Sequence, residues 1–412
     1  MLTVMAEFSY PKHKIRIALF ESIHPASIDA LTSAGYSVEL FPKALEGEAL
    51  TRAVADAHVI GVRSRTKIRH EQIAGATRLL CIGCFSVGTD QVSLDDASRH
   101  GIPVFNAPHS STRSVAELTL GNIITLARRT GDKNLKMHAG LWDKSLGGAH
   151  EVRGKTLGLV GYGHIGQQVG ILAEAFGLRV SFHDVMKKLP LGLARAAASL
   201  DELLAGSDFL SVHVPDTEQT RNLINASALA RMKPGSYLLN MSRGSVVDLQ
   251  ALKHALLSGH LGGASVDVFP VEPTPAESPF ECGLEGLPNV LLSPHIGGNT
   301  EEAQKNIGLE VADAFIDFID RGSTQGAVNF PAVSLPVYPG SHRILNIHRN
   351  TPGVLAEVTR IVSEVGANID AQMLSTTRDV GYLIMDINKD LSEEVRSRIE
   401  AMPANIKTRI LF

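Results

Sequence analysis

Cysteine, tryptophan and long apolar runs are all scarce in this chain. Its 412 residues include three cysteines and one tryptophan. A small, odd number of cysteines argues against a disulfide framework and predicts reduced thiols. No apolar run approaches the roughly 18 residues of a transmembrane helix, and residues 1–10 lack the basic and apolar blocks of a signal peptide. The sequence therefore predicts a cytoplasmic protein that does not contact a membrane.

Strong charge of either sign is also lacking. The formal net charge is −4 at pH 7, which gives no reason to expect a nucleic acid partner. Hydrophobic content of 44% and charged content of 20% are ordinary for a globular protein. The length allows two or three domains, each with its own core.

Two of the cysteines, Cys81 and Cys84, form a C-x-x-C pair, a spacing found in redox and metal sites. Cys81 continues the apolar pair Leu79-Leu80, so packing in the core is the favoured interpretation. We expect no metal site.

The organising stretch is residues 156–184. An apolar run at 156–160 has the composition of a buried parallel strand and leads into Gly161-Tyr162-Gly163-His164-Ile165-Gly166, a G-x-G-x-x-G turn. Residues 179–183 form a second strand that ends on Asp184. The helix predicted between them ends at Gly177, and its apolar face comprises Val169, Leu172, Ala173 and Phe176.

Each part of this stretch suits a dinucleotide. Gly161 permits the tight turn, Gly163 lets the backbone approach the pyrophosphate, and Gly166 lets the helix pack on the strand. The helix N-terminus offers N–H groups and a positive dipole end to that anion. Asp184 can accept hydrogen bonds from both ribose hydroxyls. A lone glycine motif is weak, but strand, motif, helix, strand and acid in this order predict a dinucleotide site.

Strand-like and helix-like segments alternate on both sides of the motif. Before it we expect strands at 15–20, 37–41, 59–62 and 79–82, helices at 24–34 and 50–55, and a long helix at 114–129. After it we expect strands within 207–215, at 236–240 and at 290–292, and a helix at 301–320. This alternation predicts two α/β lobes with the active site in the cleft between them. From residue 342 the order becomes βαββαβ, which is ferredoxin-like.

Side chains that can transfer a proton or bind an anion follow the predicted strands of the second lobe. Open α/β sheets bind ligands at these carboxyl ends of the strands. His295 can transfer a proton near neutral pH. Glu272 would orient its imidazole and raise its pKa. Arg243 would hold a carboxylate through two parallel N–H bonds. Each residue alone has a structural explanation, but together they predict hydride transfer with a proton carrier and an anion clamp. Trp142 lies in a predicted loop, where it would either cap the core or contact another subunit.

The motifs at 106–108, 161–166, 243–244, 272–273 and 293–298 resemble those of the D-2-hydroxyacid dehydrogenase family. The similarity covers nearly the whole chain and is greatest with short bacterial members that act on 3-phosphoglycerate and carry a C-terminal ACT domain. It implies a Rossmann-like NAD-binding domain (109–298) inserted in a flavodoxin-like substrate domain (1–108 and 299–330). A linker (331–341) and a ferredoxin-like ACT domain (342–412) would follow.

The resemblance implies NAD-dependent oxidation of 3-phosphoglycerate to 3-phosphohydroxypyruvate, the first step of serine synthesis, with possible reduction of 2-oxoglutarate. In this interpretation His295 is the acid/base, Glu272 is its partner, and Arg243 anchors the substrate carboxylate. Asp184 would select NAD over NADP, although Lys187 and Lys188 follow it closely. The implied cofactor contacts are Gly161, Gly163, His164, Ile165, Gly166, Asp184, Met241, Ser242, Arg243, Asp267, His295, Gly297 and Gly298.

Further residues would bind the substrate and an effector. Arg63, Ser64, Arg65 and Asn106 match the substrate-binding positions, the two arginines suiting the phosphate; the alternative for them is a solvated basic loop. The positions that correspond to a serine site in an ACT module are His348, Asn350 and Asn368. Arg349 departs from the expected pattern there. We expect a homo-oligomer, with a tetramer favoured.

Three alternatives stay open from the sequence. The chain could act on another 2-hydroxy acid, as a glyoxylate or hydroxypyruvate reductase does. It could be a non-catalytic scaffold that senses NAD. Its ACT module could bind a different amino acid or none.

Overall fold

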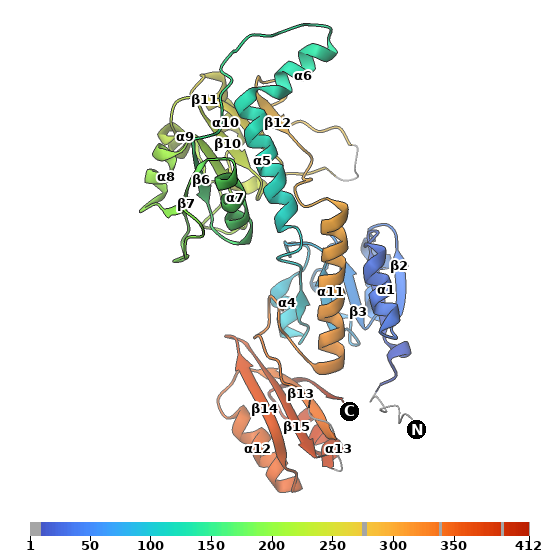
Figure 1. The fold of residues 1–412 in the computed structure, drawn as a ribbon. Helices are drawn as coiled ribbons and strands as arrows, with labels where there is room; N and C mark the ends of the chain where they lie inside the picture. The colour runs from blue at the N-terminus through green and yellow to red at the C-terminus, as the bar shows by residue number, and fades with distance from the viewer. Residues whose placement is uncertain (1–9, 274–277, 338–339, 389–390, 412) are drawn as a thin grey trace, which may run out of the picture. The chain divides into compact units, whose positions relative to one another are not determined.

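The computed structural model of the chain describes residues 10–273, 278–337, 340–388 and 391–411. Two compact units are present (Figure 1): Met1–Ser110 together with Gln304–Phe412, and Ser111–Ala303. Within the described residues, no helix is both long and apolar enough to cross a membrane. No group of three or more His, Cys, Asp or Glu side chains among them is placed to hold a metal ion.

The first unit contains a five-stranded parallel sheet in the order β2-β1-β3-β4-β5. This is the flavodoxin-like order that we expected. Its strands are β1 (Arg16–Phe20), β2 (Ser37–Phe41), β3 (Val59–Val62), β4 (Cys81–Cys84) and β5 (Val104–Phe105). Its helices are η1 (Lys12–Lys14), α1 (Pro25–Ser33), α2 (Gly47–Asp56), α3 (His70–Ala74), α4 (Leu94–Arg99) and α11 (Glu301–Arg321).

The two faces of this sheet bury separate cores, because every residue of β3 and β4 is apolar or small and enclosed. Cys81 belongs to the core that includes α11, whereas Cys84 belongs to the opposite one. Both thiols are free, and burial raises the pKa of Cys84 to about 12. The packing interpretation is confirmed, since side chains on opposite faces cannot form a redox pair or share a metal.

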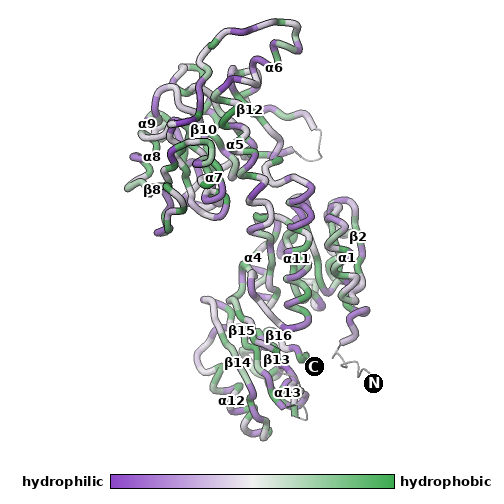
Figure 2. The backbone as a smooth tube through the Cα atoms, viewed as in Figure 1, coloured by the Kyte–Doolittle hydropathy of each residue, from purple (hydrophilic) through white to green (hydrophobic). Residues whose placement is uncertain are grey.

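Along α11 hydrophilic and hydrophobic residues alternate (Figure 2), and Val311 and Phe315 enter the core.

The second unit contains a seven-stranded parallel sheet in the order β12-β11-β10-β9-β6-β7-β8. The strand order reverses between β6 and β9, as in a dinucleotide-binding fold. The strands are β6 (Thr156–Val160), β7 (Arg179–His183), β8 (Arg195–Ala196), β9 (Phe209–Val212), β10 (Ser236–Asn240), β11 (Leu261–Val266) and β12 (Val290–Leu292). The helices are α5 (Thr112–Arg128), α6 (Thr130–His138), α7 (His164–Ala175), α8 (Leu200–Gly206), α9 (Ala226–Arg231), η2 (Gly244–Val246) and α10 (Leu249–Leu257).

The long helix expected at 114–129 is confirmed as α5, whereas two other expectations for this unit were wrong. Helix α5 ends where expected, because Arg129 adopts a left-handed conformation (φ 52) that interrupts the hydrogen-bond ladder, and α6 beyond it was not expected. Phe176 is exposed, since it lies after the last residue of α7 and off its buried face. Trp142 does not cap the core, because its side chain is 80% exposed.

The C-terminal part of the first unit has the predicted βαββαβ order. It consists of β13 (Ser341–Arg349), α12 (Val354–Val365), β14 (Ile369–Thr376), β15 (Val380–Asn388), α13 (Ser392–Glu400) and β16 (Asn405–Leu411). The antiparallel sheet runs β14-β15-β13-β16. One face packs on α12 and α13. The other contributes Leu345 and Tyr382 to the core that contains Phe315 of α11.

The expected linker, residues 331–341, is packed rather than free over residues 331–337, and so is the stretch just before it. Phe330 and Val333 are buried in the core of the first unit. Arg343 holds this stretch in place, because its guanidinium donates hydrogen bonds to the Leu335 and Pro336 carbonyls. The same guanidinium forms an ion pair with the buried Asp386. Residues 338 and 339 lie outside the described residues, and the domain limits given above stay predictions.

Candidate functional site: a glycine turn and a histidine–glutamate pair

The three motif glycines differ in what surrounds them. Gly161 has φ +91, and a Cβ built there would lie 2.5 Å from the His213 carbonyl oxygen. A Cβ on Gly166 would lie 2.3 Å from the Gly161 carbonyl oxygen, so the helix can pack this closely only on glycine. A Cβ on Gly163 would meet nothing within 4 Å. The turn is therefore tight at two positions and open at the third.

The open glycine is the N-cap of α7, which receives no side-chain cap among the described residues. The positive end of the helix dipole therefore lies at the turn, where it would stabilise an anion. The turn leaves β6 next to β9, where the strand order reverses. These features fit a dinucleotide pyrophosphate. His164 at the helix start is exposed and Ile165 half-buried.

Asp184 lies at the end of β7, beside the glycine turn. Its Oδ2 accepts from the Tyr162 N–H at 2.8 Å, and its Oδ1 accepts from the Met186 N–H at 2.8 Å. Each carboxylate oxygen has a second lone pair, so the group can still accept from hydroxyls. Asp184 is thus fixed by two backbone bonds at the position expected for the ribose acceptor.

His295 and Glu272 form a direct pair. Nδ1 of His295 lies 2.9 Å from each carboxylate oxygen of Glu272. The hydrogen bond that Nδ1–H donates to Glu272 and the charge of that carboxylate raise the pKa of His295 against the opposing effect of burial. Burial raises the pKa of Glu272, but the hydrogen bond and charge of His295 outweigh it and the net pKa is lowered. With Nδ1 occupied, Nε2 is the imidazole nitrogen left for a reacting proton.

A buried aspartate holds the backbone of that histidine. His295 has φ 55, a conformation that costs energy for a residue with a side chain. Its N–H donates to the Asp267 carbonyl at 2.8 Å. The Asp267 carboxylate accepts from the Ser293 hydroxyl (2.5 Å) and from the N–H groups of Ile296 (2.9 Å) and Gly297 (2.8 Å). We expected Asp267 only as a cofactor contact, and its position after a buried strand was the one available signal.

The Arg243 turn packs against the segment that carries Glu272. A Cβ on Gly244 would lie 1.9 Å from the Phe269 carbonyl carbon, so only glycine allows this approach. The turn is shaped by buried Asn240, whose side chain accepts from the Ser242 N–H and donates to the Arg243 carbonyl. The positive charge of Arg243 is close enough to lower the pKa of both His295 and Glu272. The sequence did not single out Asn240, although it ends a buried strand.

The remaining predicted contacts of this unit lie in the same turns. Met241 and Ser242 are buried after β10. A Cβ on Gly297 would lie 3.0 Å from Asp267 Oδ2, and one on Gly298 would lie 3.1 Å from Ser111 Cβ.

In the first unit, Arg63, Ser64 and Arg65 follow β3. Arg63 is partly buried, while Ser64 and Arg65 are exposed. Burial lowers the pKa of Arg63, the charge of Glu21 raises it, and the charge of Arg65 lowers it further. Asn106 follows β5 and donates to the Val87 carbonyl at 2.6 Å.

The predicted effector residues lie at the ends of β13 and β14. His348 is buried on β13 with Nδ1 2.9 Å from Asn346 Oδ1, and burial lowers its pKa. Asn350 donates to the Thr377 carbonyl at 2.8 Å and Asn368 to Asp370 at 3.0 Å, and both are exposed. Their role in effector binding stays a prediction.

Two family models match the chain. One, described as the NAD binding domain of D-isomer specific 2-hydroxyacid dehydrogenase, covers residues 120–297. The other, described as an AHAS small subunit-like ACT domain, covers residues 344–407. The first range includes the glycine turn and the His295–Glu272 pair.

Known proteins are similar over almost the full length. The chain is 49% identical to a D-3-phosphoglycerate dehydrogenase of Escherichia coli K12, over 99% of this chain and 100% of that relative. It is 48% identical to a D-3-phosphoglycerate dehydrogenase of Dictyostelium discoideum, over 98% and 99% respectively. A solved structure of D-lactate dehydrogenase from Aquifex aeolicus, complexed with NAD and lactic acid, has a TM-score of 0.68 and 30% identity, covering 76% of this chain and 100% of that one.

Proposed function

The chain belongs to the D-isomer specific 2-hydroxyacid dehydrogenase family, and from that membership we propose that it oxidises 3-phospho-D-glycerate to 3-phosphohydroxypyruvate, the first step of L-serine biosynthesis. The protein is an NAD-dependent oxidoreductase. The observation that carries the proposal is the His295–Glu272 pair, which follows two strands of the sheet that bears the glycine turn.

The proton is moved by His295. With Nδ1–H donated to Glu272, the neutral imidazole keeps its lone pair on Nε2 and accepts the hydroxyl proton of the substrate as the carbonyl forms. NAD, which the glycine turn and Asp184 would hold, would supply the acceptor for the hydride that leaves the hydroxyl-bearing carbon. The imidazolium that results is stabilised by the Glu272 carboxylate. In the reverse direction His295 returns the proton as a general acid.

The substrate carries two anionic groups, and the chain offers arginines for both. Arg243 binds the carboxylate, because its guanidinium matches that group bidentately and follows β10 in the turn packed beside Glu272's segment. Arg63 and Arg65, with Ser64 and Asn106, bind the phosphate end. Reduction of 2-oxoglutarate to 2-hydroxyglutarate is a side activity, since that substrate is also a 2-oxo acid with a second anion.

Regulation and location complete the proposal. L-serine binds the ACT module through His348, Asn350 and Asn368 and inhibits the enzyme. The protein is cytoplasmic, with small-molecule partners only. Support for the serine site comes from the ACT family match and from the exposed amides of the two asparagines.

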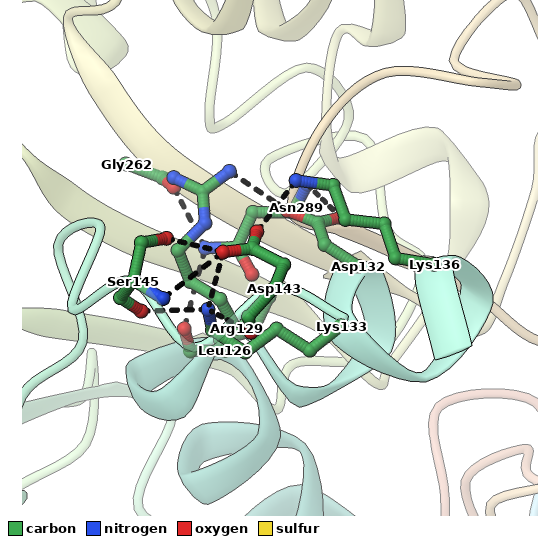
Figure 3. Close-up of polar contacts among 9 residues, drawn as sticks. All are labelled: Leu126, Arg129, Asp132, Lys133, Lys136, Asp143, Ser145, Gly262 and Asn289. Atoms are coloured by element: carbon green, nitrogen blue, oxygen red, sulfur yellow. Dashed lines mark hydrogen bonds and ion pairs between the residues drawn. The ribbon is translucent and has the colours of Figure 1, made fainter. Parts of the chain in front are cut away.

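The protein is a homo-oligomer, with a tetramer favoured, and the loop after α6 contributes to a subunit contact. Trp142 is exposed there, yet the adjacent Asp143 is firmly held (Figure 3): it binds Lys136 Nζ at 2.7 Å and the Ser145 hydroxyl at 2.6 Å. The exposed large apolar side chains of this region are Leu135, Met137, Leu141, Trp142 and Leu146. Apolar side chains presented by a fixed loop are suited to pack on another surface.

An assay of the purified protein tests the proposed reaction. With NADH, we expect 3-phosphohydroxypyruvate to be reduced with a higher kcat/KM than hydroxypyruvate or glyoxylate, and L-serine to lower the rate. A preference for glyoxylate or hydroxypyruvate would contradict the substrate, and NADH binding without turnover of any of the three would contradict the enzyme's role. Calorimetric titration with L-serine checks the effector separately, and no heat would contradict it.

A further inference from the structure

Two consecutive non-glycine residues in the first unit adopt left-handed backbone conformations directly after β1. Glu21 has φ 72 and Ser22 has φ 50. Each costs energy relative to ordinary backbone, and such conformations persist only where surrounding contacts hold them. The Glu21 N–H donates to the Phe41 carbonyl at 2.8 Å and the Ser22 hydroxyl to the Pro42 carbonyl at 3.0 Å, and the Glu21 carboxylate adds two further bonds.

The Glu21 side chain is buried and bonded to the loop that follows β3. Its Oε2 accepts from the Arg65 N–H at 2.9 Å and its Oε1 from the Thr66 N–H at 2.6 Å. The residue is 9% exposed, and its bond to the Thr66 N–H is shielded from water. Because each oxygen serves a different N–H, the carboxylate fixes the orientation of the peptide planes on either side of Arg65.

The carboxylate also balances positive charge. Arg63 and Arg65 repel each other, and burial of Arg63 adds a desolvation cost, whereas the charge of Glu21 favours the charged form of Arg63. The buried anion therefore offsets part of the cost of holding the Arg63 charge in this loop. The side chains of Ser64 and Arg65 stay exposed next to it.

The topology places this arrangement where a ligand is expected. β1 and β3 are parallel neighbours, with Leu19 opposite Gly61, so Glu21 and Arg63 follow adjacent strand ends. The strand order β2-β1-β3 reverses direction at this pair. Open α/β sheets bind ligands at the carboxyl ends of strands at such a reversal.

We propose that Glu21 is a positioning residue for substrate recognition: its carboxylate holds the Arg63–Arg65 loop so that both guanidinium groups are presented to the phosphate of the substrate. The inference rests on the proposed function of the two arginines. Glu21 acts through the loop and does not touch the substrate.

The test compares a phosphorylated and an unphosphorylated substrate. Glu21→Ala is expected to raise KM for 3-phosphohydroxypyruvate about tenfold or more, because hydrogen bonds to a buried charged acceptor are among the stronger ones. KM for hydroxypyruvate should change less than about twofold. Glu21→Gln retains the volume and one acceptor oxygen, so its effect on the phosphorylated substrate should be smaller. If Glu21→Ala does not fold, Glu21→Gln alone still gives the comparison.

Ser22→Gly is the matched control. It relieves the strain at the neighbouring position without altering the carboxylate, so both KM values should stay unchanged. A purely structural role of Glu21 would raise both KM values together, or neither, while lowering the melting temperature, and either pattern would overturn the inference.

Arg65→Ala separates this inference from the proposed function. If Arg65→Ala leaves KM for 3-phosphohydroxypyruvate unchanged, the phosphate role of the loop is wrong and both proposals fail. If it raises that KM while the Glu21 variants leave it unaltered, only the inference about Glu21 is overturned.

Discussion

His295 Nδ1 is equidistant, at 2.9 Å, from the two carboxylate oxygens of Glu272. The carboxylate thereby occupies Nδ1, leaves Nε2 for a reacting proton and raises the pKa of the imidazole. It acts on a residue whose backbone is held by Asp267, so the position of the imidazole is determined from both ends.

The first prediction concerns pH. Oxidation needs neutral His295, so kcat/KM for 3-phosphoglycerate should rise with pH through the pKa of the imidazole and level off above it. Because Glu272 raises that pKa, Glu272→Gln should move the rising limb to lower pH and reduce the plateau roughly tenfold or more. The measurement is the pH dependence of kcat/KM for the wild type and for Glu272→Gln. If the rising limb lies at the same pH in both, Glu272 does not set the pKa of the group that takes up the proton.

Of two glycine substitutions in the turn, one should lower the stability of the unit and the other should weaken NAD binding. Gly166→Ala places a Cβ against backbone and should destabilise the unit by about 1–3 kcal/mol. Gly163→Ala enters open space, so the melting temperature should hold while the dissociation constant for NAD rises. Calorimetry and NAD titration of both variants test this pair. Unweakened NAD binding by Gly163→Ala would show that the pyrophosphate lies elsewhere.

Removing Asp184 should change cofactor preference. Asp184→Ala eliminates the ribose acceptor and the like charge that opposes a 2′-phosphate, so affinity for NAD should fall more than affinity for NADP. It also removes two backbone bonds, and we expect a lower melting temperature. Lys187→Ala serves as the control and should leave NAD affinity unaltered. If the ratio of the dissociation constants for NAD and NADP is unchanged in Asp184→Ala, other residues determine the cofactor selectivity.

Trp142 is the residue whose removal should affect assembly. Trp142→Ala is expected to shift the protein toward smaller species in analytical ultracentrifugation, since aromatic anchors dominate many interfaces. Leu257, an exposed apolar residue of α10, provides the control, and Leu257→Ala should leave the sedimentation profile unchanged. Identical profiles for wild type and Trp142→Ala would exclude the tryptophan from the contact.

The order of the elements was predictable from the sequence because apolar periodicity and glycines recur at fixed places along the chain. The turn at 161–166 and the later pairing of His295 with Glu272 followed from the same patterns. Helix α6 was not predictable, because it is largely polar and none of its residues is buried. Two hydrogen bonds were also not predictable, namely the one that Asn240 donates to the Arg243 carbonyl and the one that Glu21 accepts from the Thr66 N–H, because a single polar residue at a strand end has no periodic signature.

The most direct test is the turnover of His295→Ala, measured with its affinity for NAD. The account predicts that kcat for 3-phosphoglycerate falls by roughly 10²–10⁴ while the dissociation constant of NAD changes little, because only the proton carrier is lost. Turnover equal to that of the wild-type enzyme would contradict it.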